Sequence, residues 1–289
     1  YFKSVKDELI RFGDKMNKNK DGIFMSRKFI KINDCSICKN QKKTKFINIE
    51  GFLYVKCKAC NHVYLYNQLK EKFLLDLYHN SKTDIISRKK LAIKPVDEYR
   101  LKLFKKYTRI MLNNKKGINQ NLIDIGCGDG RFLEFCKEKY KFNLYGLDFS
   151  LDMKKKLINI LGKKNFFFGK RIQDIKLKNK SFDFITLWGV LEHVSDLDKF
   201  VSEIKRLLSQ YGKILVFIPN INSEAFDILG HDTPTLSPRA HLNFFSRKSM
   251  GKLCKKFKLK VLFKGQELPV IDLMHEKVNA NKAYINKIL

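Results

Sequence analysis

The sequence predicts an α/β fold: a doubly wound, Rossmann-like and mostly parallel sheet, with a small metal-binding module on its N-terminal side. Three observations lead to this prediction. Strand-like apolar segments alternate with helical segments over residues 95–265, a glycine-rich loop follows the first of these strands, and two cysteine pairs occur before residue 66. The 289 residues are enough for one large or two smaller domains.

The glycine-rich loop is the most informative segment of the chain. Gly126, Gly128 and Gly130 follow an apolar strand and precede a helical segment, and without a Cβ they let the backbone turn tightly and approach a ligand. Asp124 places a carboxylate near the end of the strand, where open α/β sheets bind ligands. The G-x-G-x-G spacing is not that of a dinucleotide site or a P-loop. Because the carboxylate would repel a pyrophosphate, the loop favours a cationic ligand, S-adenosylmethionine.

A second apolar strand ends at Asp148, 18 residues beyond Gly130. An acidic residue at this place commonly binds both ribose hydroxyls of an adenosine. The segments that follow alternate between helical and strand-like character, which is typical of a parallel sheet. The predicted elements cover 151–162, 165–169, 182–189, 196–209, 212–219 and a sixth strand at 259–263.

The chain closely resembles the class I S-adenosylmethionine-dependent methyltransferases over roughly 95–265. The resemblance rests on four elements in the right order: D-I-G-C-G-D-G, G-L-D-F-S, F-D-x-I-x-x-x-x-V-L-E-H-V and G-K-I-L-V-F-I-P. It implies that Asp124, with the backbone of the glycine loop, holds the methionine moiety of the donor and that Asp148 holds the ribose. The other residues expected at the cofactor are Gly126, Cys127, Gly128, Gly130, Phe149 (beside the adenine), Arg171 and Trp188.

Arg171 marks a departure from the resembled family. Relatives often carry an acidic residue near the adenine amine, whereas this chain has Lys170-Arg171-Ile172. Recognition of the amine by a side chain is therefore in doubt, and backbone contacts can suffice.

Four cysteines form a second motif. Cys35, Cys38, Cys57 and Cys60 follow the pattern C-x2-C-x18-C-x2-C, which places four thiolates at the corners of a tetrahedron around a structural Zn²⁺ ion. The segments between the pairs predict a hairpin, and asparagine after each pair suits a turn with positive φ. We predict a zinc ribbon at 31–66 with no open ligand position. The adjacent His62 is expected on the surface and not as a fifth ligand.

The ribbon is similar to the N-terminal module of many bacterial methyltransferases from polysaccharide and secondary-metabolite clusters. It is also similar to ribbons in some RNA-modifying enzymes. The motif alone therefore does not distinguish a methyltransferase of small molecules from an RNA-modifying enzyme. The expected domains are a helical segment at 1–30, the zinc ribbon at 31–66, a connecting segment at 67–94, the methyltransferase domain at 95–265 and a C-terminal extension at 266–289.

The charge and the apolar pattern limit which partners and which location can be expected for the protein. The formal net charge is +30, and 49 of the 59 basic residues are lysines. Arginine is the usual choice for bidentate recognition of phosphates and bases, so a solvated basic surface is favoured over a nucleic-acid site. No apolar run is long enough to span a membrane and no signal peptide is visible. We therefore expect a cytoplasmic protein without a transmembrane segment.

Three residues are candidates for the catalytic chemistry. Methyl transfer needs an in-line approach of the nucleophile and often a base, and histidine suits that task near neutrality. His241 is the first candidate, because many relatives show a similar H-x-x-F-F-S segment after the fifth strand. Glu192 and His193 follow the fourth strand at the expected rim of the site. Purely structural roles in capping or packing stay open for all three.

The irregular stretch 220–245 contains His241 and, without supporting context, His231; in this fold it would lie over the methyl donor. The leading interpretation is O-methylation of a small molecule, a sugar or nucleotide-sugar for a surface polysaccharide or related product, with C- and N-methylation open. The alternatives are an RNA methyltransferase that uses the ribbon and the basic surface, and a non-catalytic zinc-ribbon adaptor with a degenerate methyltransferase domain. The intact glycine loop and Asp148 argue against the adaptor.

Overall fold

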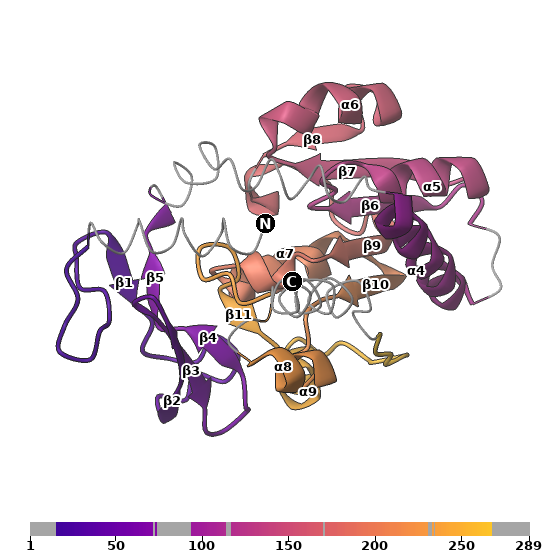
Figure 1. Ribbon diagram of the computed structural model, residues 1–289. Coiled ribbons are helices and arrows are strands. Elements are labelled where there is room, and N and C mark those ends of the chain that lie inside the picture. Colours follow the sequence, from indigo (N-terminus) through magenta and orange to yellow (C-terminus); the bar gives the residue numbers. More distant parts are fainter. Residues whose placement is uncertain are drawn as a thin grey trace, which may run out of the picture.

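A five-stranded parallel sheet forms the centre of the molecule (Figure 1). The computed structural model describes residues 16–71, 73, 94–113, 117–169, 171–230, 233 and 235–267. All neighbouring strands of this sheet run parallel, in the order β10-β9-β6-β7-β8. The strands are β6 (Asn121–Ile125), β7 (Asn143–Asp148), β8 (Phe166–Phe168), β9 (Phe182–Trp188) and β10 (Leu208–Phe217). This confirms the predicted doubly wound α/β fold.

The order of the strands reverses beside β6, because the chain moves from β6 outward to β7 and β8 and then returns to β9 on the other side. Ligands of open α/β sheets bind at such a switch point, outside the carboxyl ends of the strands. The fold therefore directs attention to the ends of β6, β7 and β9.

Alternating side chains of β6 supply the two faces of the sheet. Leu122 packs into one apolar core and Ile123 into another, and both are fully buried. The first core is covered by the helices α4 (Lys94–Leu112), α5 (Arg131–Lys139) and α6 (Leu151–Leu161). The second is covered by α7 (Leu197–Leu207), the short 3-10 helix η1 (Ile172–Asp174) and α9 (Arg247–Lys256). Ser246 caps α9 with a reciprocal capping box to Ser249.

The cysteine-rich segment forms a second, antiparallel sheet with the order β11-β4-β3-β2 (Figure 1). Its strands are β2 (Lys43–Ile49), β3 (Phe52–Cys57), β4 (Val63–Leu65) and β11 (Asn243–Phe244), while β1 (Phe29–Lys31) pairs with β5 (Asn67–Leu69). The strand β11 comes from the far end of the long segment after β10, so the ribbon and the methyltransferase part share one sheet. They also share the core under α7 and α9, to which Cys35, Ile37 and Val55 contribute.

One predicted element is wrong. Residues 259–263 do not form a strand, because the left-handed Lys258 (φ 54°) turns the chain off α9 and Leu259 donates its N–H to the carbonyl of Cys254. Leu262 is 65% exposed, so the apolar pattern there does not correspond to a buried sheet edge. Within the helical segment predicted at 1–30, residues 1–15 fall outside the described residues. So do Lys170, His231 and most of the segments predicted at 67–94 and 266–289.

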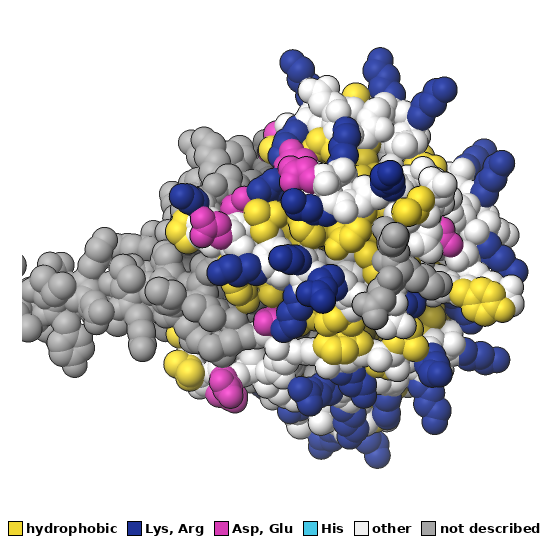
Figure 2. Space-filling view, turned by 90° about the vertical axis from the view of Figure 1, so that its right-hand side faces the viewer, with side chains coloured by type: hydrophobic (Ala, Val, Ile, Leu, Met, Phe, Trp, Pro, Cys, Tyr) yellow, Lys and Arg dark blue, Asp and Glu magenta, His cyan; other side chains and the backbone are white. Residues whose placement is uncertain are grey.

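The surface is strongly basic, as the net charge of +30 requires. Lysine and arginine side chains are spread over the part of the face that Figure 2 shows in colour, with few acidic ones among them. A concave surface along α4 is lined by Lys102, Lys105, Lys106 and Arg109. Within the described part of the chain, none of the helices combines the length and the apolar character that a membrane span needs.

Candidate functional site

The glycine loop joins β6 to α5 and leaves an open cradle at its centre. Gly126, Gly128 and Gly130 all have left-handed φ values, of 69°, 54° and 75°. A Cβ on Gly126 would come within 2.8 Å of Val190, and one on Gly130 within 2.7 Å of Ile160, whereas one on Gly128 would meet nothing within 4 Å. Two of the glycines therefore permit close packing, and the third leaves backbone facing open space where a ligand fits.

Asp148, at the end of β7, is bound to this loop. Its Oδ2 accepts a hydrogen bond of 2.8 Å from the N–H of Gly128, and its Oδ1 accepts one of 2.8 Å from the N–H of Ser150. The carboxylate is 6% exposed. Each carboxylate oxygen has a further lone pair, so Asp148 can hold the loop and still accept hydrogen bonds from ribose hydroxyls.

Asp124, at the end of β6, is the most deeply buried acid of the loop. It is 2% exposed, and its Oδ1 accepts a hydrogen bond of 2.6 Å from the hydroxyl of Thr186 on β9. Burial raises the pKa of Asp124 to about 8, and the neighbouring carboxylates of Asp148 and Asp129 add to the rise. A cation bound here would relieve both the desolvation and the repulsion. The donor set thus fits S-adenosylmethionine, which carries a sulfonium and an ammonium group.

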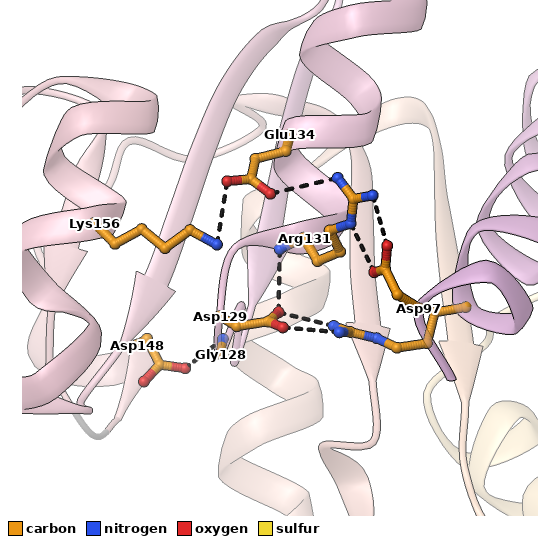
Figure 3. A network of polar contacts seen from close by, with 8 residues as sticks. Asp97, Gly128, Asp129, Arg131, Glu134, Asp148 and Lys156 are labelled. Carbon is orange, nitrogen blue, oxygen red and sulfur yellow. Dashed lines mark hydrogen bonds and ion pairs between the residues drawn. The ribbon is translucent and has the colours of Figure 1, made fainter. Parts of the chain in front are cut away.

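Two bidentate ion pairs fasten α4 to the loop and were not predicted from the sequence (Figure 3). Arg100 contacts both oxygens of Asp129 at 2.8 and 2.7 Å, and Arg131 contacts both oxygens of Asp97 at 2.7 Å. Burial opposes ionisation of Asp129, but the Arg100 guanidinium holds its pKa below the usual value. These pairs are only partly exposed, and their fork geometry fixes the loop more firmly than a lysine would. Asp97 and Arg131 are 34 residues apart, and no motif in the sequence indicates that they pair.

The remaining residues expected at the cofactor occupy different surroundings. Phe149 follows β7 and is half-buried. Cys127 is buried under the loop, and burial raises the pKa of its thiol, so it packs as a neutral group. Arg171 is exposed and pairs with Asp174 at 2.9 Å. Trp188, at the end of β9, packs its ring against Phe104, Phe132, Tyr107 and Phe217, and its buried Nε1 has no hydrogen-bond partner among the described residues. Their contacts with a cofactor stay predictions.

The three catalytic candidates come together beyond the end of β9. Glu192 and His193 lie on the 3-10 helix η2 (Leu191–His193), and the rings of His193 and His241 have centroids 4.7 Å apart. Glu192 is 3% exposed, and burial raises the pKa of its carboxyl group to about 8. Burial lowers the pKa of both histidines, that of His241 to about 3. Both imidazoles are therefore neutral at physiological pH.

This Glu–His cluster (Glu192, His193 and His241) is adjacent to the glycine loop. Val190, two residues before Glu192, packs against Gly126 closely enough to exclude any Cβ there. The strands that lead to the two groups, β6 and β9, are direct neighbours in the sheet. The donor cradle and the cluster therefore lie at the same end of the sheet.

The ribbon supports the cluster from the other side. Tyr54 donates its hydroxyl to the backbone carbonyl of His241 at 2.7 Å. Asn243 donates to the carbonyl of Val194 at 2.7 Å and accepts from His62 through Oδ1 at 3.1 Å. The segment 235–245, predicted as irregular, is held here by β11 and by a bond of 2.6 Å from the N–H of Leu242 to the carbonyl of Glu192.

His62 is not a surface residue, and that expectation is wrong. It is fully buried, with Nε2 between the hydroxyl of Ser36 at 3.2 Å and the amide oxygen of Asn243. Its ring stacks on Tyr64. The burial arises because β11 adds to the ribbon sheet and covers this position, which the sequence around His62 does not reveal.

The four cysteines fit a structural zinc ion. Sulfur–sulfur distances are 3.5 Å for Cys35–Cys60 and Cys38–Cys60 and 3.6 Å for Cys38–Cys57, and all four sulfurs lie within 4.8 Å of one another. Zn–S bonds of about 2.3 Å in a tetrahedron require sulfurs about 3.8 Å apart. Lys39 and Asn61 adopt the left-handed turns that follow each pair, with φ of 59° and 60°. Four protein ligands complete the coordination, so the site is structural and not catalytic.

Two uncharacterized proteins of Methanocaldococcus jannaschii are similar: one is 34% identical over 102 residues, covering 35% of this chain and 42% of that protein. The other is 27% identical over 168 residues, covering 56% and 75%. The chain thus spans less than half the length of the first.

Solved structures with a similar arrangement include an S-adenosylmethionine-dependent methyltransferase from Archaeoglobus fulgidus, with a TM-score of 0.45, 21% identity and coverage of 76% of this chain and 95% of that one. Another is phosphoethanolamine N-methyltransferase 2 from Haemonchus contortus in complex with S-adenosyl-L-methionine, with a TM-score of 0.44, 16% identity and coverage of 66% and 46%.

The decisive comparison is with a family. Residues 96–263, more than half of the chain, match the family described as methyltransferase domain. The match begins in α4, includes the glycine loop, Asp148 and the Glu–His cluster, and ends beyond α9. The family match confirms the predictions of a methyltransferase domain and of S-adenosylmethionine as its donor. The four clustered sulfurs, which lie outside the matched residues, bear out the prediction of a module that fits zinc. This chain belongs to the methyltransferase domain family.

Proposed function

We propose that this protein transfers the methyl group of S-adenosylmethionine to a hydroxyl group of a small molecule, a sugar or nucleotide-sugar. The observation that carries the proposal is the meeting of two groups at one end of the sheet. The buried carboxylates around the glycine loop fit a cationic methyl donor, and the neighbouring Glu–His cluster offers hydrogen-bond acceptors to a hydroxyl. The carbohydrate class is supported by the resemblance of the ribbon and its methyltransferase domain to enzymes of polysaccharide clusters.

The donor supplies an electrophilic methyl group when it is bound. Asp148 and the open backbone at Gly128 would hold its nucleoside end, and the buried carboxyl group of Asp124 would offset its positive charge. In the transfer, the acceptor oxygen forms a bond to the methyl carbon while the bond from that carbon to sulfur breaks and leaves its electrons on sulfur. The hydroxyl proton must leave in the same event.

His241 is the first candidate to take that proton. Its Nδ1 lies 2.5 Å from the carbonyl of Thr235, so Nδ1 carries the hydrogen and Nε2 is left as the acceptor. His193 is fixed in the same way by the carbonyl of Ala240 at 2.9 Å. Glu192 and His193 complete the group that positions the acceptor hydroxyl.

The proposal is tested by product analysis with a panel of acceptors. The purified protein is incubated with S-adenosylmethionine labelled at the methyl group and with nucleotide-sugars, free sugars, small amines and RNA, and products are identified by mass spectrometry. We expect label on a sugar hydroxyl and loss of turnover in His241→Gln. Label on an amine or on carbon would contradict the hydroxyl acceptor while keeping the methyltransferase.

An RNA acceptor is the second candidate, favoured by the basic surface of Figure 2 and by the lysines along α4. A true RNA site should keep its affinity near physiological ionic strength, whereas attraction through lysines alone falls steeply with salt. Filter binding across a salt series distinguishes a specific RNA site from nonspecific attraction through lysines. Retention of tight binding at 200 mM salt, together with label on RNA, would favour the RNA methyltransferase over the sugar enzyme.

A further inference from the structure

The Glu–His cluster has the donor arrangement of a metal site. One ring nitrogen from each of His193 and His241 and one carboxylate oxygen of Glu192 all lie within 4.8 Å of one another. Glu192 is only 3% exposed, and its buried Oε2 atom has no hydrogen-bond partner among the described residues. An unpaired buried acceptor of this kind is unfavourable, and a bound cation would offset that cost.

Both histidines have the backbone hydrogen bond that is common among metal-binding histidines. His193 donates its Nδ1–H to the carbonyl of Ala240 at 2.9 Å, and His241 donates its Nδ1–H to the carbonyl of Thr235 at 2.5 Å. In each ring Nε2 is therefore the unprotonated nitrogen. Metal-binding histidines almost always donate their other ring N–H to a carbonyl or carboxylate, which fixes the tautomer and the ring orientation.

The backbone around the three side chains is held from several directions. The carbonyl of Glu192 accepts from the N–H of Leu242, and the carbonyl of His241 accepts from Tyr54. Asn243 binds the carbonyl of Val194. The ribbon, the end of β9 and the 235–245 segment thus converge to hold the two adjacent ligands of η2 beside His241, a third that follows 48 residues after His193.

We propose that Glu192, His193 and His241 bind a divalent transition-metal ion, distinct from the ion at the four cysteines. This inference rests on the proposed function, because the open coordination positions would take the hydroxyl of the methyl acceptor. Two imidazoles and one carboxylate suit zinc, iron or manganese and leave positions free, whereas magnesium prefers oxygen ligands. The thiolate site is closed by its four ligands and has no such role.

The metal changes how the acceptor proton leaves. A hydroxyl bound to a divalent ion has a lowered pKa and releases its proton to water, so with the metal in place His241 serves as a ligand and water replaces it as the proton acceptor. The resulting alkoxide oxygen attacks the methyl carbon, an O–C bond forms, and the C–S bond breaks with its electron pair staying on sulfur. The positive sulfonium becomes the neutral thioether S-adenosylhomocysteine, and no oxidant or reductant is required.

The inference is tested by metal counting on the full chain with its cysteine site loaded. The protein is dialysed against excess Zn²⁺, washed free of loosely bound ion and analysed by mass spectrometry of the metal, and Zn²⁺ binding to the second site is followed by calorimetry. We expect two zinc ions per chain in the wild type and one in Glu192→Gln and in His241→Gln, with at least tenfold weaker binding at the second site. Glu138→Gln removes the same charge from the exposed face of α5 and should keep two ions.

Donor binding, metal content and methylation are measured separately on the same samples, so that loss of folding can be distinguished from loss of the metal. S-adenosylmethionine binding should be unchanged in Glu192→Gln and His241→Gln, which shows that the domain is folded. A wild type that holds one ion under excess Zn²⁺, or variants that still hold two, would overturn the metal site while hydroxyl methylation could stand. Two ions in the wild type without methylation of any hydroxyl would keep the metal site and defeat the proposed function.

Discussion

The donor cradle and the Glu–His cluster lie side by side but are built in opposite ways. The cradle comes from one continuous stretch, from Asp124 to Asp148, whose strand, loop and helix position each group locally. The cluster combines η2 with a segment almost fifty residues later, and the ribbon sheet fastens the two together through Tyr54 and Asn243. The comparison teaches that donor binding should depend on the parallel sheet alone, whereas the acceptor chemistry should depend on the ribbon as well.

Removal of the ribbon zinc should have the largest effect and should separate the two regions. A structural zinc site contributes folding energy outright, so chelation loosens the sheet that holds β11. We expect methyl transfer to fall by about 100-fold or more, while the Kd for S-adenosylmethionine changes by less than about threefold. Steady-state turnover and calorimetry on the same chelated sample measure both. Equal losses of donor binding and turnover would show that the two regions are not independent.

The pH dependence of donor binding should be the next largest effect. The pKa of Asp124 is raised to about 8, so in the free protein its carboxyl group is mostly protonated at lower pH. A cationic donor favours the carboxylate, and its affinity should therefore rise up to about tenfold per pH unit from pH 6 toward 8. Asp148, Asp129 and Arg100 act on the same group, so their charges enter this dependence. Calorimetry in two buffers of different ionisation enthalpy should detect release of about one proton.

Asp124→Asn is the matched variant for this effect, because it keeps the shape and the contact with Thr186. It should flatten the pH dependence and weaken donor binding. A carboxyl group whose pKa is raised in the folded state loses folding stability as pH rises from its unfolded value through about 8. The variant should therefore melt at a higher temperature than the wild type at pH 8. A lower melting temperature would contradict the raised pKa.

Much of the cradle could be predicted from the sequence because its residues lie close together along the chain. The glycines, Asp124 and Asp148 fall within one strand–loop–helix–strand unit, where spacing reports geometry directly. The contacts that could not be predicted join distant segments: Arg100 with Asp129, and His62 with Asn243, which are 181 residues apart.

Dependence on contacts between distant segments also explains the two wrong predictions, those for His62 and for residues 259–263. His62 was expected on the surface because part of its cover, Asn243 and Phe245, comes from the other end of the chain. Residues 259–263 have a strand-like apolar pattern, but a strand needs a partner edge, and a local sequence does not specify one. His241 and Glu192 were identified as separate candidates, and their closeness to each other follows only from the fold.

Asn243→Ala should have a moderate effect confined to the cluster. The change removes the bond to the carbonyl of Val194, which holds the end of η2 against β11, and the contact with His62, which holds β11 against the ribbon. We expect kcat to fall about tenfold, as is usual when groups that orient ligands are lost, with no change in donor affinity. Kinetics with saturating donor measure kcat. An unchanged kcat would mean that η2 is held without the ribbon.

Tyr54→Phe should have the smallest effect. It removes one hydroxyl that donates to the carbonyl of His241 and keeps the ring contact with Phe244. The loss of one such bond is worth about 1 kcal/mol, so turnover should fall roughly fivefold and the melting temperature by a few degrees. The comparison with Asn243→Ala then ranks the two links between ribbon and cluster.

The central claim, that the cradle binds S-adenosylmethionine, is tested most directly by calorimetry on the wild type and on Asp148→Ala. The variant removes a carboxylate that bonds the loop at Gly128 and is proposed to bind the ribose. We predict binding of one donor per chain in the wild type and affinity about 10–100-fold weaker in the variant, since charge-assisted hydrogen bonds are lost. No binding to the folded wild type, or equal affinity in the two proteins, would contradict the account.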